Sequence, residues 1–383
     1  MTRELPFTLE EYQTRVDKVR VKMAQRNLAT LLLVNPVSTN YLTGYQTIAV
    51  SGYQCLILPL GGKPTMLVWE LELPGVFLSS RIEDGVSYRT GEDQFEVTRQ
   101  LLHQRGLLGG TVGIERDGHF LSAQDYERLI GALGRCKLAD GSGIIRELLR
   151  EKSPQEIAYI KEAGKISAKG MHAAIDAASA GATDNQVAAA ACQALIEAGS
   201  EYMCVAPIVT TGTRSGIPHT THQRNRIEQG DPVWIETGAC CHRYSAPLMR
   251  TVFVGQPSDG AERLADASMA ALEKVMSTIT PGITADEIAT EGAKALPLDD
   301  PSVVFHHTYG YSIGLGFPPT WADDSSLTLV KGNKTTLEPG MVFHATMGLR
   351  REGKYGAVVS ETIAVTENGC EALTDFPREF FYK

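Results

Sequence analysis

Hydrophobic positions in the first part of the chain follow two spacings, one typical of helices and the other of buried strands. Apolar residues recur at helical spacing from Tyr12 to Met23, and Thr8 and Glu11 before them have the arrangement of a capping box. A second helical pattern covers residues 95–102. Continuous apolar runs of strand length cover residues 30–34, 55–60, 65–69 and 111–115. Strands that alternate with helices in this order predict an α/β layer around a small mixed sheet.

A glycine-rich break at residues 140–143 separates this α/β region from a second region. The Ser-Pro-Gln-Glu sequence at residues 153–156 then has the pattern of a helix start, with an N-cap, a proline and an acidic third residue. Helical patterns follow at 153–178, 184–198, 259–279 and 284–295. Between them lie β segments at 232–235, 251–254, 341–345 and 362–365. We therefore predict an α/β domain at residues 1–150 and an α+β domain with a curved antiparallel sheet at residues 151–383.

The composition restricts the class of protein. A chain of 383 residues exceeds one ordinary core, and its 43% hydrophobic and 21% charged residues are typical of a soluble globular protein. The net charge of −9 argues against nucleic acid or an anionic membrane as the main partner. No apolar run approaches the roughly 20 residues that cross a bilayer. The seven cysteines form no CxxC motif, so we expect a reduced, cytoplasmic protein without a disulfide framework.

Two short segments place polar groups in surroundings that make them candidates for chemistry. Glu236 follows the apolar residues 233–235, and a carboxylate there would be half-buried, which is costly unless it is paired or used. His219 lies in the glycine-containing segment 211–222. A histidine in such a segment is either a surface residue or a group that titrates near working pH.

Two further segments combine glycines, aromatic residues and strand patterns. Residues 305–319 contain two glycines that allow close approach of a ligand, and their aromatic residues either form the wall of a pocket or pack as in an ordinary loop. Residues 338–344 run from a turn into a strand, and residues 358–363 follow with Glu361 among them.

These segments together resemble the signature blocks of a known family. Residues 233–251, 310–315 and 338–343 resemble blocks of the creatinase/aminopeptidase P/methionine aminopeptidase family. Residues 41–45 and 152–157 resemble its N-terminal domain motif and the start of its inter-domain helix. The resemblance extends over nearly the whole chain. It implies a pita-bread C-terminal domain behind a smaller α/β N-terminal domain, in a homodimer.

The chain departs from this family at the metal-binding positions. The family's metallopeptidases bind two metal ions through two Asp, one His and two Glu. The matching positions in this chain are Glu236, Pro247, Tyr311, Thr346 and Glu361. Two carboxylates without an imidazole do not make the usual dinuclear centre. The resemblance therefore implies the family's metal-free branch, without a metal or other cofactor.

Within that branch the chain is more similar to ectoine hydrolases than to creatinase. His219 stands where creatinase-like enzymes have their catalytic histidine. Creatinase also uses an arginine of its N-terminal domain, which residues 49–55 lack, and its second active-site glutamate is Met249 here. The blocks that look most like ectoine hydrolases are 236–251, 311–321 and 340–344.

The resemblance implies hydrolysis of a C–N bond in a small amidine or cyclic amidine zwitterion, with ectoine or 5-hydroxyectoine as the first choice. We expect Glu236 to act as nucleophile or base, Glu361 to bind the amidinium and His219 to shuttle a proton. The expected substrate-binding residues are Tyr311, His344, His306, Arg250 and Trp321. Arg250 or Arg243 is the candidate for the substrate carboxylate, and a structural salt bridge is the alternative for either.

Three other functions stay open from the sequence. They are a metal-dependent Xaa-Pro dipeptidase or aminopeptidase, a creatinase-like amidinohydrolase and a non-enzymatic peptidase-like binding module. A bound metal would favour the first, and an open peptide groove without an enclosed pocket would favour the last.

Overall fold

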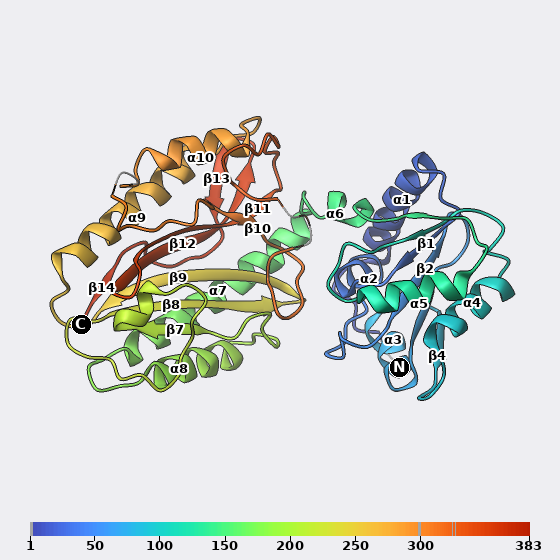
Figure 1. The fold of residues 1–383 in the computed structure, drawn as a ribbon, viewed down its shortest axis with the longest axis horizontal. Helices are drawn as coiled ribbons and strands as arrows, with labels where there is room; N and C mark the ends of the chain where they lie inside the picture. Colours follow the sequence, from blue (N-terminus) through green and yellow to red (C-terminus); the bar gives the residue numbers. More distant parts are fainter. Residues whose placement is uncertain (1–2, 298–299, 324, 326) are drawn as a thin grey trace. The chain divides into compact units, whose positions relative to one another are not determined.

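The computed structural model describes residues 3–297, 300–323, 325 and 327–383. The chain divides into two compact units, Met1–Leu148 and Leu149–Lys383 (Figure 1). The described helices include none that is long and apolar enough to cross a membrane. The predicted fold class, an α/β unit followed by an α+β unit, is confirmed.

The first unit is built around a mixed sheet of six strands in the order β4-β3-β2-β1-β5-β6. The strands are β1 (Thr30–Leu33), β2 (Cys55–Pro59), β3 (Thr65–Trp69), β4 (Asp84–Tyr88), β5 (Val112–Ile114) and β6 (Leu138–Asp140). The helices are α1 (Leu9–Gln25), α2 (Pro36–Thr43), η1 (Glu70–Glu72), α3 (Leu73–Ser79), α4 (Gln94–Gln104), α5 (Ala123–Leu133) and α6 (Ile144–Leu148). Thr8 caps α1 as predicted, because its hydroxyl accepts the Glu11 backbone N–H.

The second unit has helices on the outside of two four-stranded sheets. Its helices are α7 (Pro154–Ala177), α8 (Asp184–Glu197), η2 (Gly212–Gly216), α9 (Asp259–Thr278) and α10 (Ala285–Ala293). Its strands are β7 (Ile208–Thr211), β8 (Pro232–Cys241), β9 (Tyr244–Phe253), β10 (Tyr311–Ser312), β11 (Val342–Arg351), β12 (Tyr355–Thr366), β13 (Gly369–Ala372) and β14 (Phe381–Tyr382). The predicted capping box is present, since Ser153 and Glu156 each bond the other's backbone N–H at the start of α7.

The two sheets of this unit, β14-β9-β8-β7 and β10-β11-β12-β13, meet where β9 lies beside β12. Side chains bridge them there: Ser360 Oγ accepts the Met249 N–H at 2.8 Å, and Thr251 Oγ1 donates to Val358 O at 3.1 Å. Helices α7 and α8, green in Figure 1, pack on the first sheet, and α9 and α10, orange, pack on the second. The outer face of each sheet therefore packs against helices in an apolar core. The inner faces are not covered by these helices, and a functional site can form there.

Strands β8 and β9 are longer than the apolar runs that predicted them. The runs 232–235 and 251–254 are the ends of two ten-residue strands. Ile235 and Leu248 pack outward on α7 and α8, whereas Glu236 and Met249, which pair across the strands, face inward. The apolar pattern ends at Glu236 because one face of the sheet lines a cavity there.

The turn between β8 and β9 explains the role of Arg243. His242 and Arg243 have φ values of 50° and 69°, the left-handed conformation of a tight two-residue hairpin. The Arg243 guanidinium is fully buried and donates to Tyr202 O at 2.7 Å and to Gly316 O at 3.2 Å. Arg243 therefore holds the turn and the loop beside it, and it does not line the cavity as a partner for a substrate carboxylate.

Candidate active site

A cavity of about 700 Å³ lies against the inner faces of β8, β9 and β11 in the second unit. Its other walls come from residues 215–220, 305–308 and 319–321. The volume is within the range of about 300–1,000 Å³ that is usual for small-molecule sites. Of the residues predicted from the sequence, those that line it are Glu236, His219, Tyr311, His306 and Trp321.

Strand alternation determines which side chains enter the cavity. Trp234 and Glu236 enter from β8, and Met249 enters from β9 directly opposite Glu236. Thr346 and Arg350 enter from β11, with Gly348 between them on the same face. The cavity floor is therefore formed by alternate residues of β8 and β11 together with Met249 of β9.

Glu236 is the acidic side chain that lines this cavity. In the described part of the chain its carboxylate has no hydrogen-bond or ion-pair partner, and burial raises its pKa to about 7 while Arg350 acts in the opposite direction. The carboxylate therefore divides between its protonated and ionised forms near neutral pH. A cation that enters the cavity would shift it to the ionised form.

Tyr311 ends a chain of buried polar groups behind the cavity. Its hydroxyl accepts the Trp321 Nε1–H at 2.8 Å and lies 2.8 Å from His344 Nδ1. His344 Nε2 lies 2.7 Å from Ser360 Oγ, which also accepts the Met249 N–H. Burial and the nearby Glu236 carboxylate raise the pKa of Tyr311, so its hydroxyl stays protonated.

The donors and acceptors in this chain select one tautomer of His344. Burial and the charge of Arg250 lower the pKa of His344 to about 3, so the ring is neutral. With the proton on Nδ1, Ser360 donates to Nε2 and Nδ1–H donates to Tyr311, so the Tyr311 proton is left for the cavity. With the proton on Nε2, the buried Ser360 hydroxyl would lack an acceptor in the described part of the chain, at a cost of about 1–3 kcal/mol. The first arrangement is therefore favoured.

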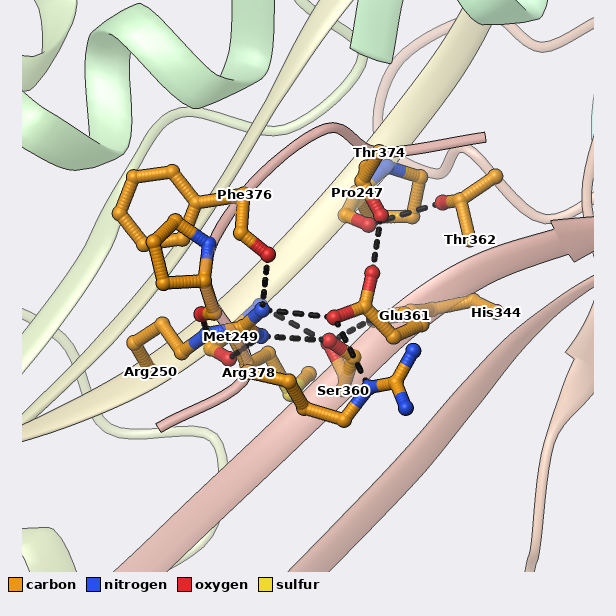
Figure 2. Close-up of polar contacts among 11 residues, drawn as sticks. Pro247, Met249, Arg250, His344, Ser360, Glu361, Thr362, Thr374, Phe376 and Arg378 are labelled. Carbon is orange, nitrogen blue, oxygen red and sulfur yellow. Dashed lines mark hydrogen bonds and ion pairs between the residues drawn. The ribbon is translucent and has the colours of Figure 1, made fainter. Parts of the chain in front are cut away.

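Glu361 does not enter the cavity, contrary to the sequence prediction. It accepts from Arg250 Nη2 at 2.6 Å, lies 3.5 Å from Arg378 Nε and is hydrogen-bonded by Thr374 (Figure 2). Glu361 and Arg250 are both fully buried. Arg250 also donates to the carbonyls of Met249 and Ser360 (Figure 2). The pair is internal to the fold, so Arg250 is not placed to bind a substrate carboxylate either.

The reason for this difference is the register of β11 and β12. Thr346 pairs with Ser360, and Ala345 pairs with Glu361. Since Thr346 faces the cavity, Ser360 shares its face and Glu361 points to the other one. We matched the family's last glutamate to Glu361. The residue that faces the cavity side is instead Ser360, one position earlier in the chain. His344 is also outside the cavity lining and reaches it through Tyr311.

The residues at the metal-binding positions do not fit a dinuclear metal centre. With the register of β12 known, they are Glu236, Pro247, Tyr311, Thr346 and Ser360. Among the described residues, no group of three or more His, Cys, Asp and Glu side chains is placed to hold a metal ion. A single carboxylate beside hydroxyl groups is a poor donor set for a catalytic divalent ion.

The opposite part of the cavity is basic. His219 and His306 come from two loops, and His219 has a φ of 55°, in the left-handed region. Partial burial lowers the pKa of His306, and the positive charge of Arg350 and His219 lowers it further. Arg350 was not predicted from the sequence. Its position could have been found by counting four residues along the strand from Thr346.

The chain is similar to known proteins over nearly its whole length. Residues 158–367 match the model of metallopeptidase family M24, and residues 15–150 match that of the creatinase/prolidase N-terminal domain. The chain is 31% identical to the ectoine hydrolase of Halomonas elongata, over 99% of each chain. It is 26% identical to the Xaa-Pro dipeptidase of Pyrococcus furiosus, over 95% of this chain and 99% of that one. The solved prolidase of Pyrococcus horikoshii superimposes with a TM-score of 0.84 at 25% identity, covering 96% of this chain and 99% of that one.

Proposed function

This chain belongs to metallopeptidase family M24 and is a hydrolase, and we propose that it opens the C–N bond of a small cyclic amidine zwitterion without a metal ion. The predicted family and its pita-bread fold are confirmed. Our choice of substrate is ectoine or 5-hydroxyectoine. The observation that carries the proposal is the isolated Glu236 carboxylate in a cavity whose other metal-binding positions hold neutral side chains.

Glu236 supplies the negative charge that an amidinium requires. The bound cation lowers the pKa of Glu236 below its value of about 7, so the carboxylate is ionised when substrate is present. It then acts either as a nucleophile on the amidine carbon or as a base that takes a proton from water. In both routes the oxygen of one water ends on that carbon, one ring C–N bond breaks, and an amide and an amine are formed.

Tyr311 and His219 supply the remaining protein groups for this reaction. The Tyr311 hydroxyl proton is free to donate to the tetrahedral intermediate at the reacting carbon, because His344 and Trp321 both donate to the Tyr311 oxygen. His219 lies on the exposed side of the cavity and delivers the proton that the leaving nitrogen needs. Trp321 and His306 complete the walls around the ring.

The proposal is tested with a substrate panel after exhaustive chelation. The panel contains ectoine, 5-hydroxyectoine, creatine and an Xaa-Pro dipeptide, and mass spectrometry scores the addition of one water. We expect turnover of a cyclic amidine that chelation and added manganese, zinc or iron leave unchanged, and loss of that turnover in Glu236→Gln. Dipeptide cleavage that depends on added metal would instead establish an Xaa-Pro dipeptidase.

We also propose that the protein acts as a cytoplasmic homodimer, as its family resemblance implies. Light scattering of the purified protein at assay concentration measures the assembly directly. A monomer that keeps full turnover would contradict a requirement for the dimer.

A further inference from the structure

We propose that Arg350, stacked on Trp234, binds the carboxylate of the substrate and makes the enzyme specific for carboxylated rings. The proposal rests on the proposed function for the identity of the reacting ring. The anion site itself depends on Arg350 and its surroundings and on no particular ring.

The Arg350 guanidinium has hydrogen-bond donors that the protein does not use. Its Nε is buried and lacks a hydrogen-bond partner in the described part of the chain, and the same described residues offer its side chain no ion pair within 4.0 Å. The two arginines that the sequence suggested for this role are different. Arg243 and Arg250 are each saturated by backbone carbonyls and, for Arg250, by Glu361. Arg350 is therefore an arginine that lines the cavity with donors to spare.

Trp234 holds the guanidinium in place without using its donors. The Arg350 Cζ lies 3.9 Å from the centroid of the Trp234 ring, the distance of a cation–π stack. Gly348 makes this arrangement possible, since a Cβ there would lie 2.5 Å from Trp234 Cη2 and 3.5 Å from Arg350 Nη1. The guanidinium is thus supported on one face while its edge, which carries the N–H groups, stays available to a planar carboxylate.

The charges in the cavity match a zwitterion in one orientation. Burial lowers the pKa of Arg350 to about 10 and Glu236 raises it, so the guanidinium remains protonated at neutral pH. Glu236 and Arg350 influence each other electrostatically but form no ion pair within 4.0 Å among the described contacts. Each is free for a substrate group of opposite charge, with the amidinium at Glu236 and the carboxylate at Arg350.

The test compares two rings that differ by the carboxylate. One is ectoine and the other is its decarboxylated analogue, 2-methyl-tetrahydropyrimidine, and calorimetric titration measures the affinity of each for Glu236→Gln protein, in which turnover is blocked. In this background Arg350→Met should lose about 10- to 100-fold in affinity for ectoine and should not weaken binding of the analogue, a cation that Arg350 repels. Arg350→Lys, which keeps the charge but not the planar fork, should lose less.

Arg351→Met is the matched control, because Arg351 pairs with Asp300 at 2.9 Å away from the cavity lining. It should bind both rings like its parent, and circular dichroism checks that every variant is folded. Equal losses for both rings in Arg350→Met, or no loss for either, would overturn the proposal.

A second pair separates this proposal from the proposed function. If the wild-type protein hydrolyses no amidine, the proposed function fails, and titration with L-proline and pyrrolidine then tests the anion site by itself. Selective weakening of proline in Arg350→Met would retain the carboxylate site for another substrate. If the wild-type protein binds ectoine no better than its decarboxylated analogue, and L-proline no better than pyrrolidine, the carboxylate site is refuted.

Discussion

Replacing Glu361 by Gln distinguishes a residue that stabilises the fold from one that performs chemistry. Glu361 and Arg250 are both fully buried, and their charged atoms are 2.6 Å apart. Removing one charge leaves the other uncompensated in the interior, which typically costs about 3–5 kcal/mol. The carbonyls that accept from Arg250 do not replace a full negative charge, and the neighbouring Arg378 adds a second positive charge. We therefore expect the free energy of unfolding to fall by about 3 kcal/mol or more.

The matched control is Glu371→Gln, which breaks the pair between Glu371 and Lys161. These side chains are half-exposed and 2.8 Å apart, so the change should be less than about 1 kcal/mol. Urea unfolding followed by tryptophan fluorescence measures both variants, because two of the three tryptophans, Trp234 and Trp321, lie in the second unit.

The activity of the same variants decides the role of Glu361. The folded fraction of Glu361→Gln should keep turnover within about threefold of the wild type, since its carboxylate does not line the cavity. A variant that melts like the wild type but has lost turnover by 100-fold or more would refute this reasoning. Such a result would return Glu361 to the reaction, as the sequence first suggested.

Three further predictions concern the cavity itself. For Glu236, the folded pKa of about 7 lies above the usual value of 4.5, so kcat/KM should rise with pH through about 7. Glu236→Gln should be more stable than the wild type at pH 8 but not at pH 4, where the carboxyl is protonated in both the folded and the unfolded state. A flat pH profile together with equal unfolding curves would contradict the raised pKa. Ser360→Ala should lower kcat by about tenfold with little change in KM, because His344 loses the donor that fixes its tautomer, and an unchanged kcat would show that Tyr311 is oriented without it. Gly348→Ala should displace the Trp234 ring and raise KM for the carboxylated ring, measured beside the decarboxylated analogue, whose KM should stay the same.

Much of the fold could be predicted from the sequence because local signals and tertiary packing agree. The helices predicted at 184–198 and 259–279 are present as α8 and α9, and the Ser153 capping box starts α7. The strands were predicted too short for a physical reason. Apolar periodicity reports burial in a core, and β8 and β11 leave the apolar pattern where one face turns to the cavity.

The site could be predicted only in part. Glu236 was found because a carboxylate in an apolar strand is conspicuous, and it lines the cavity. Glu361 was misplaced because β12 is buried on both faces, so its sequence carries no alternation that tells which of Ser360 and Glu361 points inward. A shift of one residue in a strand moves a side chain to the opposite face. Arg350 was missed because its partner is a tryptophan more than a hundred positions away, which no local pattern reveals.

The hydrogen-bonded chain from Ser360 to Tyr311 has a consequence for how this site can change by mutation. A glutamate introduced at position 360 would place a charge in the buried space beside His344, a neutral ring whose pKa is lowered to about 3. Metal binding would not offset the cost of this single substitution, because Pro247, Tyr311 and Thr346 would still offer no carboxylate or imidazole. Each substitution that introduces a metal ligand is therefore unfavourable by itself, until several are present together. The neutral network therefore disfavours stepwise conversion of this cavity into a metal site.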